Sequence, residues 1–206
     1  DIMHLQNEIN NVLQFGVDFI HVDIMDNHFV PNLAMNLAIC SALAKQRIKY
    51  NVHLMANPVT SLIKYCAENQ AKTIIIHIEA GNKTQIISDL KLIKQLKCNV
   101  GLAINPNTAL IHVYEYLEFI DYLLIMGVNP GFGGQKFIEN TLTKISQAKE
   151  WQQKYNFDIG IDGGVNLENA RKILHAGVNV LIAGSAIFNK NNYKTTILKF
   201  KNYFFN

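Results

Sequence analysis

The sequence contains only three cysteines, and their placement excludes the usual cysteine-based sites. Cys40, Cys66 and Cys98 are an odd number, have no Cys-x-x-Cys or metal-ligand spacing, and lie among apolar residues. Such cysteines are typical of free thiols packed inside proteins of a reducing compartment. We therefore expect no disulfide framework, no cysteine metal site and a cytoplasmic location.

Long apolar runs, a signal peptide and concentrated positive charge are also missing. No stretch reaches the length of about 18 apolar residues that a membrane helix needs, and the N-terminus has no basic and apolar leader pattern. The net charge is only +3, and lysines such as Lys83, Lys91 and Lys94 are scattered. These absences exclude membrane and nucleic-acid partners. The 49% hydrophobic content instead indicates an apolar interior, as a parallel sheet requires.

Apolar, β-branched runs alternate with helical patterns along the whole chain. The runs predict strands at Phe19–Met25, Tyr50–Met55, Thr73–Ile78, Asn99–Asn105, Tyr122–Val128, Asp158–Asp162 and Val178–Ala183. Helical patterns cover Ile2–Leu13, Pro31–Ala44, Val59–Glu68, Lys83–Leu96, Ile138–Tyr155 and Leu167–His175. This alternation predicts a parallel α/β fold.

No Pro-, Gly- or Ser-rich linker divides the chain, so we expect a single domain over residues 1–206. The predicted fold is a TIM (β/α)8 barrel. Because the runs supply seven strands and the chain opens in a helix, this fold requires a first strand upstream of residue 1. An open doubly wound sheet is the alternative, but its glycine-rich fingerprint after the first strand is absent.

Ionisable residues lie at the ends of three predicted strands. His21 and Asp23 are two apart and face the same side of one strand, His53 lies on the next, and Asp162 ends another. A His–Asp pair that only plugs the barrel is the structural alternative, but it requires no further inward polar groups. Two imidazoles and two carboxylates suit a divalent cation such as Zn²⁺, Fe²⁺ or Mn²⁺. We expect these four residues to converge on one such ion.

Glycine-rich segments follow three predicted strands. They are Asn129–Gln135, Gly163–Gly164 and Gly184–Ser185. Turns need glycine in any case, but loops after the last strands of such barrels commonly bind phosphate through backbone N–H groups. Three such loops predict a small phosphorylated substrate.

The remaining candidates are weaker. Asp26 is expected to cap a loop, and His77, closely followed by Glu79, is expected to have a structural role. Met25, Met55 and Met126 lie near strand ends and are interpreted either as core residues or as an apolar wall beside the metal.

Taken together, these segments resemble the ribulose-phosphate 3-epimerase family. The matching stretches, which run through nearly the whole chain in family order, are His21–Asp26, His28–Asn32, Val52–Met55, His77–Ala80, Ala103–Pro106, Val128–Gln135, Ile161–Asn166 and Ala183–Phe188. As a set they are highly specific.

The resemblance implies a barrel that interconverts D-ribulose 5-phosphate and D-xylulose 5-phosphate in the pentose phosphate pathway. It implies Asp23 and Asp162 as the acid–base pair that exchanges the C3 proton through a 2,3-enediolate. It also implies a metal bound by His21, Asp23, His53 and Asp162. The implied substrate and phosphate contacts are His53, Gly131, Phe132, Gly133, Gly134, Asp162, Gly163, Gly164, Gly184 and Ser185.

The sequence departs from the family pattern at three places. A first strand with a substrate-contacting serine is not present, Asn27 stands where glycine is usual, and Gly127 stands where serine or threonine is usual. None of these changes removes an implied ligand or acid.

Three other functions remain alternatives. An epimerase for a six-carbon ketose such as allulose 6-phosphate would share the barrel and aspartates. A related barrel lyase would carry a lysine in an Asp-x-Lys-x-x-Asp pattern, which Asp23–Asp26 lacks. A non-catalytic phosphosugar-binding relic is the third. The apolar helix residues also favour a homo-oligomer.

Overall fold

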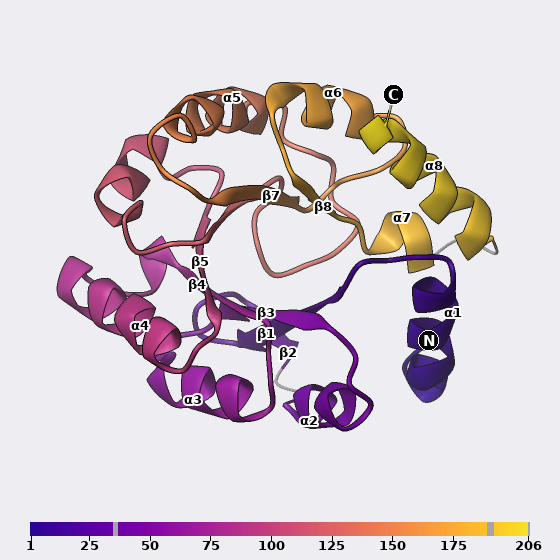
Figure 1. The fold of residues 1–206 in the computed structure, drawn as a ribbon, viewed down its shortest axis with the longest axis horizontal. Coiled ribbons are helices and arrows are strands. Elements are labelled where there is room, and N and C mark those ends of the chain that lie inside the picture. Colours follow the sequence, from indigo (N-terminus) through magenta and orange to yellow (C-terminus); the bar gives the residue numbers. More distant parts are fainter. Residues whose placement is uncertain (35–36, 189–191, 206) are drawn as a thin grey trace.

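The computed structural model describes residues 1–34, 37–188 and 192–205. In these residues one sheet runs in the order β2-β1-β3-β4-β5-β6-β7-β8. Its parallel strands are β1 (Ile20–Asp26), β3 (Tyr50–Met55), β4 (Thr73–His77), β5 (Asn99–Ile104), β6 (Tyr122–Met126), β7 (Asp158–Asp162) and β8 (Val180–Ile182), and β2 (Leu33–Ala34) pairs antiparallel with β1. The sheet curls, and helices surround it (Figure 1). The seven predicted strands are therefore confirmed.

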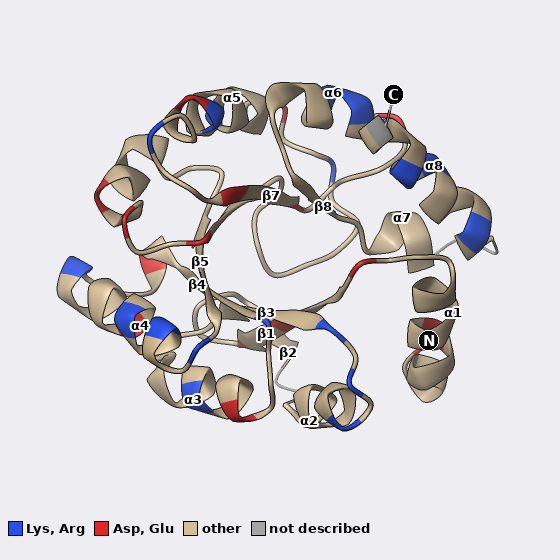
Figure 2. Ribbon diagram, in the orientation of Figure 1, with Lys and Arg blue, Asp and Glu red and all other residues tan. Residues whose placement is uncertain are grey.

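Helices connect successive parallel strands, as parallel pairing requires, and others precede β1 or follow β8. They are η1 (Ile2–His4), α1 (Leu5–Gln14), α2 (Ala38–Lys45), α3 (Thr60–Glu68), η2 (Ile78–Ala80), α4 (Lys83–Gln95), η3 (Leu110–Tyr116), α5 (Thr141–Trp151), α6 (Ala170–Ala176), α7 (Ser185–Phe188) and α8 (Tyr193–Phe205). Lys and Arg are spread over these outer helices (Figure 2). In the described residues no helix is long and apolar enough to cross a membrane.

One helix prediction was wrong in its first half. The expected helix Pro31–Ala44 begins only at Ala38, and Leu33–Ala34 forms β2 instead. The backbone N–H of Asn27 donates to the Asn32 carbonyl, which turns the chain back beside β1. Residues 35 and 36 of the expected helix lie outside the described residues.

Alternate residues of each strand face two separate cores. Ile74 and Ile76 pack outward against the helices, while Ile75, Leu124 and Met126 form a smaller cluster inside the curl. Tyr122 belongs to the inner cluster, and its hydroxyl group occupies the place that a Cβ at Gly160 would take. The two faces are thus both buried, as the continuous apolar runs indicated.

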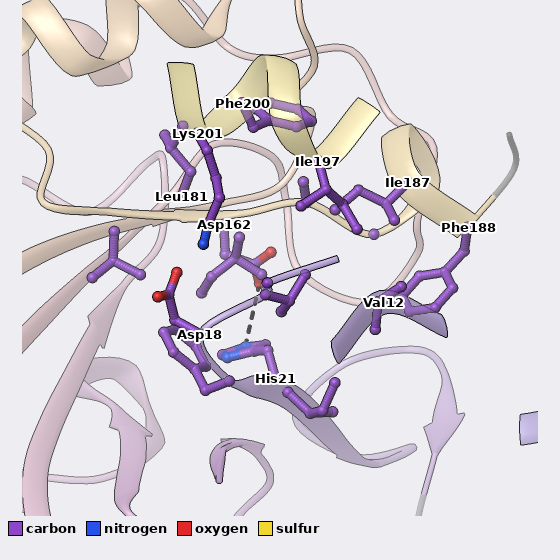
Figure 3. A pocket seen from close by; sticks show the side chains of 18 of the residues that line it. Val12, Asp18, His21, Asp162, Leu181, Ile187, Phe188, Ile197, Phe200 and Lys201 are labelled. Carbon is purple, nitrogen blue, oxygen red and sulfur yellow. Dashed lines mark ion pairs between the residues drawn. The ribbon is translucent and has the colours of Figure 1, made fainter. Parts of the chain in front are cut away.

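The sheet has an open seam between β1 and β8. β8 pairs with β7, and β1 pairs with β3 along its length and with β2 only at Met25 and Asp26. A mostly apolar cavity of about 710 Å³ lies at this seam. Figure 3 shows Ile187 from α7 and Ile197 and Phe200 from α8 around it.

Candidate metal and acid–base site

Four ionisable side chains meet where β1, β3 and β7 end. His21, Asp23, His53 and Asp162 each offer one ligand atom, and these atoms lie within 4.8 Å of one another. The parallel register places Asp23 beside His53, and the curl of the sheet brings Asp162 on β7 to the same point. The convergence predicted from the sequence is present.

The carboxylates lie between the two imidazoles. His53 Nδ1 is 3.1 Å from Asp23 Oδ1 and 3.7 Å from Asp162 Oδ2. His21 Nε2 is 3.4 Å from Asp23 Oδ1 and 3.9 Å from Asp162 Oδ2, the second ion pair being drawn in Figure 3. Two acids this close repel each other unless positive charge lies beside them. The arrangement therefore favours a bound cation or protonated histidine.

Electrostatics of the metal-free site agree with this interpretation. Burial by itself would raise the pKa of Asp23, but the close contacts and positive charges of His21 and His53 together lower it. Burial alone would lower the pKa of His53, but hydrogen bonds to Asp162 and Asp23 and their charges raise it to about 9. Asp23 is thus ionised at neutral pH, and without a metal His53 holds a proton.

His21 shows that the donor set fits a cation. Both ring nitrogens of His21 are buried, and neither has a hydrogen-bond partner among the described residues. Buried polar atoms without partners are uncommon and unfavourable. Because Nε2 points toward the two carboxylates, a divalent ion among these four residues would supply the missing interaction.

His53 is held from behind by residues that the sequence interpretation treated as structural. His53 Nε2 is 2.8 Å from His77 Nε2, and His77 Nδ1 is 3.0 Å from Glu79 Oε2. Both imidazoles are completely buried. The prediction of a structural role for His77 therefore missed its direct contact with a candidate ligand. The two-residue spacing of His77, the last residue of β4, and Glu79, in the short helix η2 that follows, was the available signal.

A smaller cavity of about 140 Å³ adjoins Asp23 and Asp162, two of the four candidate ligands. It is lined by every glycine-loop residue predicted to bind substrate and by the three methionines, namely Gly131, Phe132, Gly133, Gly134, Gly163, Gly164, Gly184, Ser185, Met25, Met55 and Met126. Asp23 and Asp162 border both this cavity and the seam cavity. His53 is completely buried and lies outside this lining, so its predicted substrate contact stays a prediction.

The glycines of the smaller cavity have two different reasons to be glycine. Gly164 has φ of 69°, and a Cβ there would lie 2.7 Å from the Phe137 backbone nitrogen. At Gly133 and Gly184 neither a positive φ nor any atom within 4 Å requires glycine. Packing therefore explains Gly164, whereas Gly133 and Gly184 leave space that a ligand can approach closely.

Two other sequence observations find their explanation in this region. Asp26 is confirmed as a loop cap, since Oδ1 accepts from the N–H groups of His28 and Phe29 and Oδ2 from that of Asn57. Asn27 has φ of 59°, a left-handed conformation that glycine adopts easily and asparagine tolerates best among the other residues. The exchange of glycine for asparagine at position 27 thus preserves the turn.

Comparison with solved structures confirms the barrel fold. A 3-keto-L-gulonate-6-phosphate decarboxylase from Vibrio cholerae matches with a TM-score of 0.69 and 16% identity, covering 94% of this chain and 87% of that one. A 3-hexulose-6-phosphate synthase matches with a TM-score of 0.68 and 14% identity, covering 96% and 91%. At such low identity these similarities establish the TIM-barrel fold class alone.

Relatives found by sequence identify the family, which the solved structures at low identity do not. Ribulose-phosphate 3-epimerase from Buchnera aphidicola subsp. Baizongia pistaciae is 42% identical over 96% of this chain and 88% of its own. The enzymes of that name from Serratia marcescens and Escherichia coli K12 are 39% and 38% identical, over 94% and 96% of this chain and 93% and 88% of their own. The model of the ribulose-phosphate 3 epimerase family matches residues 1–188. The resemblance seen in the sequence is confirmed, and the chain belongs to the ribulose-phosphate 3-epimerase family.

Proposed function

We propose that this chain interconverts D-ribulose 5-phosphate and D-xylulose 5-phosphate at a site that holds one divalent cation. The observation that carries the proposal is the pair of carboxylates, Asp23 and Asp162, held between two imidazoles beside a cavity lined with glycine. Family membership supports the choice of substrate. The activity belongs to the pentose phosphate pathway.

Inversion at C3 requires a proton to leave one face of the substrate and another to reach the opposite face. Asp23 and Asp162 come from β1 and β7 and both border the cavity, so a substrate placed between them meets one carboxylate on each side. One carboxylate removes the C3 proton to give a 2,3-enediolate, and the other delivers its proton. Each such transfer contributes roughly 10²–10⁴ in rate.

His21, Asp23, His53 and Asp162 would hold the cation. A bound divalent ion acts as a Lewis acid that stabilises negative charge on the substrate oxygens. Nitrogen and oxygen donors together favour Zn²⁺, Fe²⁺ or Mn²⁺ over Mg²⁺ or Ca²⁺. The two histidines also keep Asp23 ionised, which is the form that can accept a proton when substrate arrives.

The glycine loops would hold the phosphate. Gly133, Gly134, Gly163, Gly164, Gly184 and Ser185 line one cavity and present backbone to it, with Gly131 and Phe132 at its border. The open space beside Gly133 and Gly184 supports close approach of a phosphate group. Met25, Met55 and Met126 form the apolar wall that limits water at the reacting carbons. A homo-oligomer and a cytoplasmic location stay predictions.

The experiment is exchange of the C3 proton with solvent. Asp23→Asn and Asp162→Asn should each lower incorporation of deuterium from D₂O into ribulose 5-phosphate by at least about 10²-fold, because each removes one of the two bases. Binding of inorganic phosphate should persist. Asp158→Asn, at the exposed start of the same strand as Asp162, is the matched control and should exchange normally.

Two outcomes would contradict the proposal. Exchange at the wild-type rate in either variant would remove the two-carboxylate assignment. A clear preference of the wild-type protein for allulose 6-phosphate would replace the five-carbon substrate with a six-carbon one.

A further inference from the structure

A line of polar contacts runs from the two carboxylates into the core. His53 uses Nδ1 toward Asp23 and Asp162 and Nε2 toward His77, whose Nδ1 faces Glu79. Glu79 Oε1 accepts at 2.9 Å from the backbone N–H of Asn105. Among the described residues, the ring nitrogens of His53 and His77 therefore contact only the polar groups named here.

The contact between the two imidazoles has a direction. His53 Nε2 and His77 Nε2 are 2.8 Å apart, which is a hydrogen-bond distance and requires one proton between the two nitrogens. Either His53 donates to His77, or His77 donates to His53. In a neutral imidazole one nitrogen carries the hydrogen and the other accepts, so this choice also decides what His53 Nδ1 presents to the carboxylates.

Glu79 sets that direction from the far end. Oε1 is occupied by the Asn105 N–H, so Oε2, an acceptor, faces His77 Nδ1 at 3.0 Å. His77 therefore carries its hydrogen on Nδ1, its Nε2 accepts, and His53 donates from Nε2. Lys144 fixes the loop that supplies the Asn105 N–H, because Nζ donates to the carbonyls of Asn105, Pro106 and Thr108 at 3.0, 2.6 and 2.5 Å.

We propose that Glu79, acting through His77, fixes the hydrogen of neutral His53 on Nε2, which leaves Nδ1, the nitrogen that faces Asp23 and Asp162, as the one that binds a divalent cation. His77 and Glu79 are then positioning residues. This inference rests on the cation site of the proposed function. Groups behind a metal-binding histidine typically change metal affinity by about 10–100-fold.

Glu79→Gln tests the direction with almost no change of shape. The Asn105 N–H needs an acceptor, so the amide oxygen of glutamine takes the Oε1 position and its NH₂ group faces His77 Nδ1. His77 must then accept at Nδ1 and donate from Nε2, which forces the hydrogen of His53 onto Nδ1. Zn²⁺ affinity, measured by calorimetry with metal-free protein, should fall about 10–100-fold.

Two further variants separate direction from general damage. Thr108 also bonds to the Glu79 carboxylate, so Thr108→Val perturbs the same group without reversing any proton and should keep wild-type Zn²⁺ affinity. In His77→Gln the amide oxygen can accept from His53 while the NH₂ group faces Glu79. This variant should therefore lose less Zn²⁺ affinity than Glu79→Gln.

Nitrogen-15 NMR of the imidazoles reads the tautomers without any assay of activity. The wild-type protein with Zn²⁺ should show hydrogen on His77 Nδ1 and His53 Nε2, and metal-free Glu79→Gln should show His77 protonated at Nε2. If folded Glu79→Gln keeps the wild-type tautomers and the wild-type Zn²⁺ affinity, the role of Glu79 and His77 is overturned while the cation site stands. A loss of Zn²⁺ affinity in His77→Gln equal to that in Glu79→Gln would have the same meaning. Failure of the wild-type protein to bind Zn²⁺, Fe²⁺ or Mn²⁺ would instead overturn the cation site itself, and with it the positioning role of His77 and Glu79.

Discussion

Strands β3 to β6 and the pair β1 and β8 belong to one sheet but are covered differently. Every residue of β3, β4 and β6 is buried, whereas all three residues of β8 are only half-buried and border the seam cavity. The candidate site lies across this boundary. His53 is contributed by the enclosed side and His21 by the seam side.

The two histidines show what this difference means for the site. His53 is completely buried and has polar partners at both ring nitrogens, while His21 has no hydrogen-bond partner at either nitrogen in the part of the chain that the structure describes. One imidazole is therefore oriented by the fold before any ligand arrives. The other depends on the ligand for its interactions, so the enclosed side supplies rigidity and the seam side supplies access.

The largest expected contrast concerns stability. Ile74→Ala on β4 and Leu181→Ala on β8 remove the same number of carbons, but Ile74 is completely buried and Leu181 keeps solvent contact beside a cavity. Ile74→Ala should lower the free energy of unfolding by about 2–5 kcal/mol, and Leu181→Ala by about half of that or less. Urea denaturation measures both, and equal losses would show that the seam is packed as tightly as the enclosed side.

The second contrast concerns the two histidines themselves. His21→Leu and His53→Leu each remove a candidate ligand and should weaken cation binding by about 100-fold or more, measured by calorimetry. Only His53→Leu leaves His77 without its partner, so it alone should also lower the free energy of unfolding, by about 1–3 kcal/mol. A larger loss of stability in His21→Leu than in His53→Leu would mean that the seam side, and not the enclosed side, holds its histidine rigidly.

The smallest effect is the pH dependence of cation binding. In the metal-free protein the pKa of His53 is raised from 6.5 to about 9, so a cation must displace its proton. Affinity for Mn²⁺ should rise by about tenfold per pH unit from 7 to 9 and then level off. In the metal-free protein, protonated His53 makes its full contribution to the free energy of unfolding below pH 6.5. This contribution is lost as the pH rises through 9. A flat affinity profile would mean that His53 is unprotonated before the metal binds.

Local pattern was sufficient to predict much of this molecule. The strands Tyr50–Met55 and Asp158–Asp162 have the predicted bounds, and no bound of the other predicted strands differs from prediction by more than two residues. The convergence of the four candidate ligands was predictable because parallel strand ends meet at one face whatever the loops do. The hairpin at Leu33–Ala34 was missed because its partner, β1, is chosen by tertiary pairing and leaves no helical or alternating signal of its own.

The contacts of His77 and Glu79 behind His53 could not be predicted from the sequence for a similar reason. His77 and Glu79 are close in sequence, but their meaning depends on the neighbouring strand placing His53 within 2.8 Å and on the Asn105 N–H occupying one carboxylate oxygen. The fixing of that loop by Lys144 links positions 36–39 residues apart. Such contacts arise from tertiary packing, and the spacing of apolar residues along the sequence does not predict them.

The interlocked Tyr122 and Gly160 inside the curl have a consequence for how this sequence can evolve. The tyrosine hydroxyl fills the space that any larger residue at position 160 would need, and it has no hydrogen-bond partner among the described residues. A side chain at position 160 is tolerable only after position 122 has become smaller, while a smaller residue at 122 alone opens a void. The two positions therefore form an epistatic pair, and lineages that depart from this barrel interior must change both.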